Sequence, residues 1–374
     1  MLAPTPPMGW NSWNTFGGKL DAKLVMETAD AFIVEGLKDA GYEYVVMDDI
    51  WEADERVDGK LVPDAAKFPD GIKPVAEYVH SKGLKFGIYS CAGSYTCAGK
   101  PASYGYEEAD AQTFADWGVD FLKYDFCYAP AGTDGPTLYR RMGQALRATG
   151  RPIIFSLCEW GKHEPWTWGA SVGGHMWRTT GDINDSWESI VSIGFDKQAD
   201  LHSHAGPDHW NDPDMLVVGM YGKGNVAHGG CNDAEYRSHF TLWCLLASPL
   251  MIGCDVRSMT PATKELLTNK ELIAVNQDPM GRQGFRVGKA FHGRRRAEVW
   301  ARPLEDGSIA VGLFNLGEMD ARRMTVAWET IGLHDRRTCA VRDMIAGADL
   351  GEFTGQFSTR VAQHDVVAVR ITPR

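Results

Sequence analysis

Cysteine is scarce in this sequence of 374 residues, which contains eight. Disulfide-rich scaffolds use it several times more often, so packing rather than cross-linking must hold most of the fold. The cysteines form no C-x-x-C pair and no zinc-finger spacing with histidine, and the H-E-x-x-H motif is missing, so we expect no metal and no cofactor. A glycine-rich segment at residues 222–230 lacks the Walker lysine pattern, and we interpret it as a flexible loop.

Long apolar runs and an excess of basic residues are missing as well. No stretch approaches the ~18 apolar residues of a membrane span, and the segment MLAPTPPMGW lacks the basic and apolar regions of a signal peptide. The net charge of −11 disfavours binding to phosphate backbones and anionic lipid surfaces. We therefore expect a soluble protein, cytoplasmic or secreted with its signal removed, without a nucleic-acid or membrane partner. The sequence does not decide whether the protein forms a homo-oligomer.

Apolar residues make up 44% of the chain, enough for a large core. Up to about residue 275, short β-branched or aromatic runs alternate with longer amphipathic runs, which predicts βα units around a parallel sheet. The expected strands are residues 8–13, 42–49, 85–90, 121–127, 153–158, 176–180, 209–217 and 249–253. The expected helices are residues 22–40, 72–81, 106–117, 137–148, 185–193, 234–246 and 260–268. About eight such units favour a closed (β/α)8 TIM barrel over a doubly wound sheet.

The rhythm changes after the segment QDP at residues 277–279. Short alternating runs with turn signals predict antiparallel strands at residues 297–302, 308–314, 323–328, 337–342 and 366–371. The predicted fold is therefore of the α/β class, with a catalytic barrel at residues 1–285 and a C-terminal antiparallel β-sandwich domain at residues 286–374.

Chemically reactive side chains follow the geometry of barrel strands. Residues i, i+2 and i+4 share one face, and the C-terminal strand ends form the active site of a barrel. The segment FLKYDFC at residues 121–127 therefore places Lys123, Asp125 and Cys127 toward the barrel mouth, and Tyr124 and Phe126 toward the helices. A structural ion pair between Lys123 and Asp125 is the alternative interpretation.

Three other strand ends carry charged residues. The segment WRTTGD at residues 177–182 places Arg178 and Asp182 on one face unless Gly181 ends the strand early. A capping role for Asp182 is the alternative, although Asp185 is the better candidate to cap the following helix. Further carboxylates stand at the ends of two more strands: Asp48, Asp49, Asp212 and Asp214.

Clustered carboxylates, basic groups and tryptophans suit a sugar, because the charged groups bind vicinal hydroxyls while indole faces cover the apolar side of the ring. Glycoside hydrolysis needs one ionised and one protonated carboxyl group around the anomeric carbon. We expect Asp125 to stay ionised beside Lys123, and Asp182, if about 5 Å away, to keep its proton to higher pH because of the Asp125 charge.

Two other classes compete with a glycosidase. Clustered aspartates at a barrel mouth also hold Mg²⁺ in lyases and isomerases, although Lys123 and Arg178 would add positive charge beside the cation. The histidines of HSHAGPDH at residues 202–209 lack a metalloprotease spacing. A catalytically silent sugar-binding protein is the third interpretation.

The sequence resembles the clan of glycoside hydrolase families 27 and 36, most closely the family 27 α-galactosidases. The matching segments span the whole predicted barrel in order. They are PPMGWNSWNTF (6–16), DDIW (48–51), FPDGIKPVAEYVHSKGLKFGIYS (68–90), TCAG (96–99), YGYEEADAQTFADWGVDFLKYDFC (104–127), SLCEWG (156–161), WRTTGDI (177–183), WNDPDML (210–216) and AVNQDPMGRQG (274–284).

The resemblance implies a retaining exo-α-galactosidase that converts a terminal α-galactoside into galactose. Asp125 would be the nucleophile and Asp182 the acid/base. Asp48 and Asp49 would bind the 4- and 6-hydroxyls, Lys123 the 3- and 4-hydroxyls, and Arg178 the 2- and 3-hydroxyls. The other implied binding residues are Trp13, Cys97, Cys158, Trp160 and Asp214. Cys97 and Cys127 match a disulfide of the family.

The resemblance also bears on the choice of sugar. The bulky CEWG segment at residues 158–161 favours a 2-hydroxyl over the 2-acetamido group that α-N-acetylgalactosaminidases accept. The presence of both Asp48 and Asp49 disfavours a β-L-arabinopyranosidase. Linkage, aglycone and natural substrate are not predicted.

Overall fold

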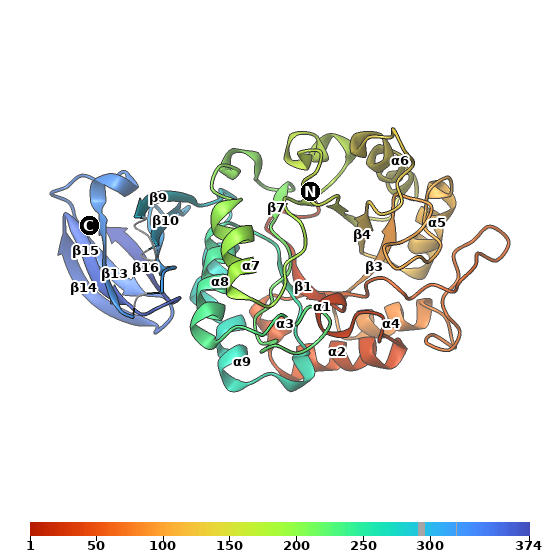
Figure 1. Ribbon diagram of the computed structural model, residues 1–374, viewed down its shortest axis with the longest axis horizontal. Coiled ribbons are helices and arrows are strands. Elements are labelled where there is room, and N and C mark those ends of the chain that lie inside the picture. The colour runs from red at the N-terminus through yellow and green to blue at the C-terminus, as the bar shows by residue number, and fades with distance from the viewer. Residues whose placement is uncertain (291–295, 319) are drawn as a thin grey trace.

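The computed structural model describes residues 1–290, 296–318 and 320–374. A barrel ringed by helices forms the N-terminal part, and a β domain lies against one side of it, next to α7 (Trp187–Ile190) and α8 (Asp233–Leu245) (Figure 1). No helix among the described residues is both long and apolar enough to cross a membrane.

Eight parallel strands form the barrel, in the order β7-β6-β5-β4-β3-β2-β1-β8. Their bounds are β1 (Met8–Asn11), β2 (Tyr44–Val46), β3 (Lys85–Cys91), β4 (Phe121–Asp125), β5 (Ile154–Cys158), β6 (Met176–Arg178), β7 (Trp210–Asp212) and β8 (Leu250–Ile252). A parallel bridge between Leu216 and Ile252 joins the segment after β7 to β8, opposite the pairing of β1 with β8. The predicted barrel is confirmed, but most strands are shorter than the sequence suggests.

The helices occupy the predicted segments with several differences. The short α1 (Trp13–Phe16) was not predicted, and the segment predicted at residues 185–193 forms α7 and then a π-helix at Val191–Asp196. The run at residues 22–40 is interrupted at Gly36, whose φ of 76° ends α2 (Ala22–Val34) before α3 (Leu37–Ala40). The sequence prediction also missed α10 (Lys270–Asn276), which follows α9 (Pro261–Leu267) after a short turn capped by Asn269. The other helices that follow barrel strands are α4 (Lys73–Ser81), α5 (Glu107–Trp117) and α6 (Gly135–Ala148).

An apolar layer fills the lower part of the barrel. It is a cluster of buried inward-facing side chains from β2, β4, β5, β6, β7 and β8, which includes Tyr44, Phe121, Ile154, Met176, Trp210 and Met251. On β4 the same face continues from Phe121 in this layer to Lys123 and Asp125 above it. The alternation therefore places a dry floor directly beneath the charged strand ends.

The C-terminal domain packs a six-stranded sheet against a two-stranded one, in agreement with the predicted antiparallel β-sandwich. The larger sheet has the order β14-β13-β16-β11-β10-β9, and β12 pairs with β15. The bounds are β9 (Phe285–Ala290), β10 (Ala297–Pro303), β11 (Ile309–Asn315), β12 (Arg322–Ala327), β13 (Thr338–Asp343), β14 (Ala348–Thr354), β15 (Gln356–Val361) and β16 (Val366–Pro373). The prediction omitted β9, β14 and β15, and the boundary predicted after residue 285 stays a prediction.

A buried arginine joins this domain to the barrel. Arg302 on β10 is completely buried, and its Nη1 donates to the carbonyls of Cys244 at 2.9 Å and Asn276 at 3.3 Å. These carbonyls lie in the last turns of α8 and α10, where backbone acceptors lack partners within the helix and the helix dipole favours a cation. Arg302 therefore caps two barrel helices from the neighbouring domain.

We predict that Arg302→Ala lowers the free energy of unfolding by about 2–4 kcal/mol, because it leaves a cavity and removes two hydrogen bonds from a charged donor. Urea titration followed by circular dichroism would measure this. The matched control is Arg370→Ala, whose partly exposed ion pair with Asp306 should contribute less than about 1 kcal/mol. An Arg302→Met variant as stable as the wild type would show that the guanidinium caps contribute nothing.

Candidate active site

A cavity opens at the C-terminal ends of the barrel strands. All eleven site residues that the sequence analysis names line it: Trp13, Asp48, Asp49, Cys97, Lys123, Asp125, Cys158, Trp160, Arg178, Asp182 and Asp214. Five further lining residues were not predicted: Asn14, Tyr89, Ile183, Met215 and Val226. The structure thus brings the predicted set together, while the roles of its members stay predictions.

Asp125 ends β4 and lies at the base of the cavity, 5% exposed. Its Oδ1 accepts a hydrogen bond from the backbone N–H of Phe126 at 2.9 Å, and its Oδ2 accepts one from the Tyr89 hydroxyl at 3.0 Å. Burial raises the pKa of Asp125 to about 6, although the charge of Lys123 opposes this shift. The carboxylate is therefore fixed by two donors and still ionised above that pH.

The pair Asp48 and Asp49 follows β2, which ends at Val46, and this early end lets both side chains reach the cavity. Asp48 Oδ2 lies 2.7 Å from Lys123 Nζ and accepts a hydrogen bond from Asn11 Nδ2 at 2.7 Å. Burial raises the pKa of Asp49, although its hydrogen bonds, among them one from the N–H of Ala98, oppose the shift. Among the residues described, Lys123 is thus the only cation that forms an ion pair with either Asp48 or Asp49, through its contact with Asp48.

Arg178, at the end of β6, joins two carboxylates on the opposite side of the cavity. Its Nη2 lies 3.0 Å from Asp182 Oδ1 and 3.0 Å from Asp214 Oδ2. Asp214 Oδ2 also accepts a hydrogen bond from the N–H of Ile183 at 2.8 Å, next to Asp182. Asp214 therefore fixes both the guanidinium and the backbone beside the proposed acid/base.

The expected protonation of Asp182 is wrong for the ligand-free protein. Its side chain is 68% exposed, and although burial of the remainder raises its pKa, the charges of Arg178 and Lys123 and the Arg178 hydrogen bond outweigh burial and lower the pKa. The charge of Asp125 alone would favour the protonated form of Asp182. The contact with Arg178 depends on the loop after β6, which ends at Arg178; this loop brings Asp182 back to the guanidinium and gives no periodic signal in the sequence.

The Asp212-Pro213-Asp214 turn shapes this side of the site. Asp214 has a φ of 93°, which is strained for a residue with a side chain, and its N–H donates to Asp212 Oδ1 at 2.9 Å. The indole N–H of Trp243 on α8 holds the Asp214 carbonyl at 2.8 Å. Asp212 does not line the cavity and instead supports the backbone that presents Asp214.

The segment after Asp182 is anchored to the glycine-rich loop at residues 222–230, for which the sequence predicts only a flexible loop. Asp185 does not cap α7, because Ser186 does, accepting from the N–H of Ser189 at 3.2 Å. The Asp185 carboxylate instead accepts from the N–H of Gly222 and the hydroxyl of Tyr236. The glycine-rich loop at residues 222–230 is thereby held against the site, where Val226 lines the cavity.

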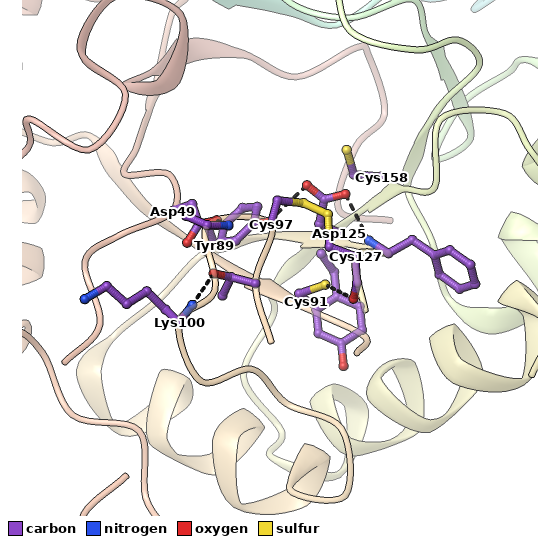
Figure 2. Close-up of a disulfide and its surroundings, with 12 residues drawn as sticks. Asp49, Tyr89, Cys91, Cys97, Lys100, Asp125, Cys127 and Cys158 are labelled. Carbon is purple, nitrogen blue, oxygen red and sulfur yellow. Dashed lines mark hydrogen bonds between the residues drawn. A yellow bond between two sulfur atoms is a disulfide. The ribbon is translucent and has the colours of Figure 1, made fainter. Parts of the chain in front are cut away.

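A disulfide between Cys97 and Cys127 borders the cavity beside Asp125 (Figure 2). It confirms the predicted pairing and links the loop after β3 to the end of β4. The Cys91 thiol lies beneath it and donates to the Cys127 carbonyl at 3.1 Å. Cys97, Cys127 and Asp125 are metal-ligating types within 4.8 Å of one another, but bonded sulfurs cannot act as thiolate ligands.

Tyr89 is the missed residue that the sequence could have revealed. It lies on β3 two residues before Cys91, so the two side chains share one face of the strand, and Cys91 lies beneath the disulfide. The rule that placed Lys123 and Asp125 in the cavity selects Tyr89 as well. Asn14, Met215 and Val226 lie outside the strands, so periodicity gives no signal for them.

Buried carboxylates beside basic groups and tryptophans in a cavity at the mouth of a parallel barrel are typical of (β/α)8-barrel glycoside hydrolases. Residues 5–278 match a family model described as alpha galactosidase A, and residues 295–371 match one for the alpha galactosidase C-terminal beta sandwich domain. The chain therefore belongs to the α-galactosidase family, glycoside hydrolase family 27.

Individual relatives agree with this assignment. An α-galactosidase from Cyamopsis tetragonoloba is 47% identical over 375 residues, covering 100% of this chain and 87% of that protein. The crystal structure of α-galactosidase I from Mortierella vinacea has a TM-score of 0.91 at 38% identity, covering 99% of this chain and 97% of that one. A family 27 β-L-arabinopyranosidase from Geobacillus stearothermophilus has a TM-score of 0.86 at 28% identity, covering 100% and 97%.

We predict that Asp125→Asn stabilises the protein at pH 7. The folded-state pKa of about 6 lies above the ordinary 3.8, so the favourable contribution of Asp125 is complete below about pH 4 and is lost as the pH rises through 6. Removing the charge should raise the free energy of unfolding by about 1–3 kcal/mol at pH 7.

Denaturant titrations at pH 7 and pH 4 would measure this effect, and the gain should vanish at pH 4. Asp182→Asn serves as the control, because a carboxylate whose pKa is lowered gives no such gain. An Asp125→Asn variant less stable than the wild type at pH 7 would contradict the shift.

Proposed function

We propose that the protein is a retaining exo-α-galactosidase that releases terminal α-D-galactosyl residues from oligosaccharides or glycoconjugates. The observation that carries this proposal is that Asp125 and Asp182 line one cavity together with the hydroxyl-binding set expected for galactose. Family membership and the names of the full-length relatives support the same activity.

In the proposed first step, an Asp125 oxygen attacks the anomeric carbon and forms a glycosyl ester, while the bond to the leaving oxygen breaks and Asp182 gives that oxygen its proton. In the second step Asp182 takes a proton from water, the water oxygen attacks the anomeric carbon, and the ester to Asp125 breaks. Tyr89 and the N–H of Phe126 hold Asp125 in place for both steps.

Because Arg178 contacts Asp182, bound substrate must raise the pKa of Asp182 before this group can act as the acid. Without ligand the guanidinium keeps this carboxyl ionised, which is wrong for a general acid. Hydroxyl groups that engage Arg178 would weaken the contact, and the negative charge of Asp125 would then favour the proton on Asp182. Once Asp125 is esterified its charge is gone, so the pKa of Asp182 falls and the same group becomes the base.

The cavity walls favour galactose over two other sugars of the family. Asp48 and Asp49 are both in place for 4- and 6-hydroxyls, and a pentopyranose has no 6-hydroxyl to bind. Trp160, held with a φ of 60° and with Lys162 Nζ 4.4 Å from its ring centroid, places a bulky side chain in the cavity wall, which disfavours a 2-acetamido group. Because a β-L-arabinopyranosidase with the same fold is 28% identical, β-L-arabinopyranosides are the second class of substrate to assay.

Of the two expected locations, we propose that the protein is secreted, because disulfides form and persist in oxidising compartments outside the cytoplasm.

We predict that Asp125→Ala lowers kcat on p-nitrophenyl α-galactoside by about 10³-fold or more, because no ester can form.

Azide should restore turnover of both catalytic variants, with a different product for each. Asp125→Ala should form β-galactosyl azide, and Asp182→Ala should form α-galactosyl azide. Proton NMR of wild-type reactions should show α-galactose first. Undiminished hydrolysis by Asp125→Ala, or β-galactose as the first product, would contradict the mechanism; loss of activity with EDTA would favour a metal enzyme.

We predict a bell-shaped dependence of kcat/KM on pH, because Asp125 acts ionised and Asp182 protonated. Because kcat/KM reports the free enzyme, in which the pKa of Asp125 lies above the lowered pKa of Asp182, the falling limb should lie near the Asp125 value of about 6, as an apparent value of the coupled pair. With 2,4-dinitrophenyl α-galactoside, whose leaving group needs no proton, Asp182→Ala should lose the falling limb of this profile. A falling limb that persists in this variant would assign it to another group.

A further inference from the structure

The loop between β15 and β16 of the C-terminal domain is fixed to the first turns of α8. Ser238 Oγ donates to the carbonyl of His364 at 2.7 Å. Beside this contact, Arg237 donates two hydrogen bonds to Asp365, from Nε at 3.0 Å and from Nη2 at 2.7 Å. The backbone of His364 is thereby held against the barrel with a φ of 56°, which is uncommon for a residue with a side chain.

The imidazole of His364 contacts two side chains of the barrel domain. Its Nδ1 lies 2.7 Å from Oε1 of Glu235 in the first turn of α8. The other oxygen of Glu235 accepts the N–H of Asn232 at 2.9 Å, so the capping box of the helix orients this carboxylate. The indole of Trp187 stacks on the imidazole, with ring centroids 4.5 Å apart and an angle of 22° between the planes. Because the His364 side chain is only 17% exposed, the stack is largely shielded from water.

Trp187 ends the loop that carries Asp182. This loop follows Arg178, the last residue of β6, and stops at Trp187, the first residue of α7. The barrel strand fixes the first end, and the stack on His364 fixes the second end from the β domain, which lies against α7 and α8 (Figure 1). Asp182 lies near the middle of the loop with its side chain 68% exposed. The position of its carboxyl group therefore depends on where both ends of the loop are held.

The anchors inside the loop do not reach its second end. Asp214 holds the N–H of Ile183, and Asp185 accepts the N–H of Gly222. Beyond them, α7 has only four residues, too few for a helix to be stable through its own hydrogen bonds. The stacked indole therefore supplies a contact at the start of α7 that the helix itself cannot supply.

We propose that Trp187 and His364 are positioning residues for the acid/base, so that the β domain takes part in the reaction without touching the substrate. The inference rests on the proposed role of Asp182 and adds two residues that act through it. A general acid must lie within hydrogen-bond reach of the leaving oxygen. A displacement of about 1 Å caused by a distant change can lower a rate by about 10²-fold. Loss of the stack lets the end of the loop shift, and Asp182 shifts with it.

Trp187→Ala and His364→Ala remove the stack, and two substrates that differ in their need for a proton report the effect. The leaving group of phenyl α-galactoside must be protonated, whereas that of 2,4-dinitrophenyl α-galactoside needs no proton. Each variant should lower kcat/KM by about tenfold or more for the phenyl substrate and by less than about twofold for the dinitrophenyl substrate. Because kcat/KM covers only the steps up to the glycosyl ester, the later action of Asp182 as a base does not enter.

Two further variants test whether the two rings act through one contact. Trp187→Phe keeps an aromatic ring that can still stack, so its loss on the phenyl substrate should be less than about threefold. The double variant Trp187→Ala/His364→Ala should lose no more than either single variant, because both changes break the same contact. Losses that multiply in the double variant would overturn the shared contact.

Two controls separate positioning from a general loosening of the β domain. His334→Ala makes the same change at an exposed histidine of this domain, which pairs with Asp335. Arg302→Ala weakens the interface between the domains at the other end of α8. Both controls should keep the wild-type ratio of kcat/KM for the two substrates. Thermal unfolding would verify that every variant is folded at the assay temperature.

Asp182→Ala is the reference that separates this inference from the proposed function, and it should show the same selectivity to a larger extent. If Asp182→Ala lowers both rates equally, or the wild type hydrolyses neither substrate, the proposed function fails and this inference with it. If Asp182→Ala is selective but the Trp187 and His364 variants lower both rates equally or neither, the function stands and the positioning role is overturned. A selective loss in all three variants confirms it.

Discussion

The balance between buried carboxylates and two cations governs this structure. Asp48, Asp49, Asp125, Asp212 and Asp214 are buried within one barrel mouth, and uncompensated charges there would be expensive. Lys123 contacts Asp48, while Arg178 contacts Asp182 and Asp214, so each cation serves one side of the cavity. Burial raises the pKa of Asp125 and Asp212 to about 6, which leaves their charges costly near neutral pH. Galactose hydroxyls are neutral donors and acceptors that can satisfy such groups without adding charge.

The barrel makes this balance feasible because it separates the apolar and polar layers along each strand. On β4 the apolar floor ends at Phe121, and Lys123 and Asp125 follow on the same face. The outward residue Tyr124 faces the helix layer and packs against Tyr139 on α6 and Phe155 on the neighbouring strand β5. Charge is thus confined to the strand ends, and the dry floor beneath them raises the strength of every electrostatic contact above.

The sequence predicts a residue's position correctly where strand alternation or a motif determines it. It does not predict positions that are determined by the path of a loop. Lys123 and Asp125 follow from the period of β4, and the barrel itself from the alternation of strands and helices. The pKa of Asp182 could not be inferred, because the loop that returns it to Arg178 has no period. The same holds for Asp185, which binds the glycine-rich loop instead of capping α7, and for Val226 on that loop. In the β domain, the exposed strand β14 has little apolar alternation to reveal it.

The segment that carries Asp182 is held at both ends while its carboxylate stays open to solvent. Asp214 holds the N–H of Ile183, and Asp185 binds the loop at Gly222. Further along, the indole of Trp187 stacks on His364 of the C-terminal domain with ring centroids 4.5 Å apart, and His364 contacts Glu235 on α8. The β domain therefore supports, from outside the barrel, the segment that carries Asp182. In the proposed mechanism Asp182 gives up a proton and regains it in each cycle, which needs a fixed backbone and an accessible carboxyl, and these contacts provide both.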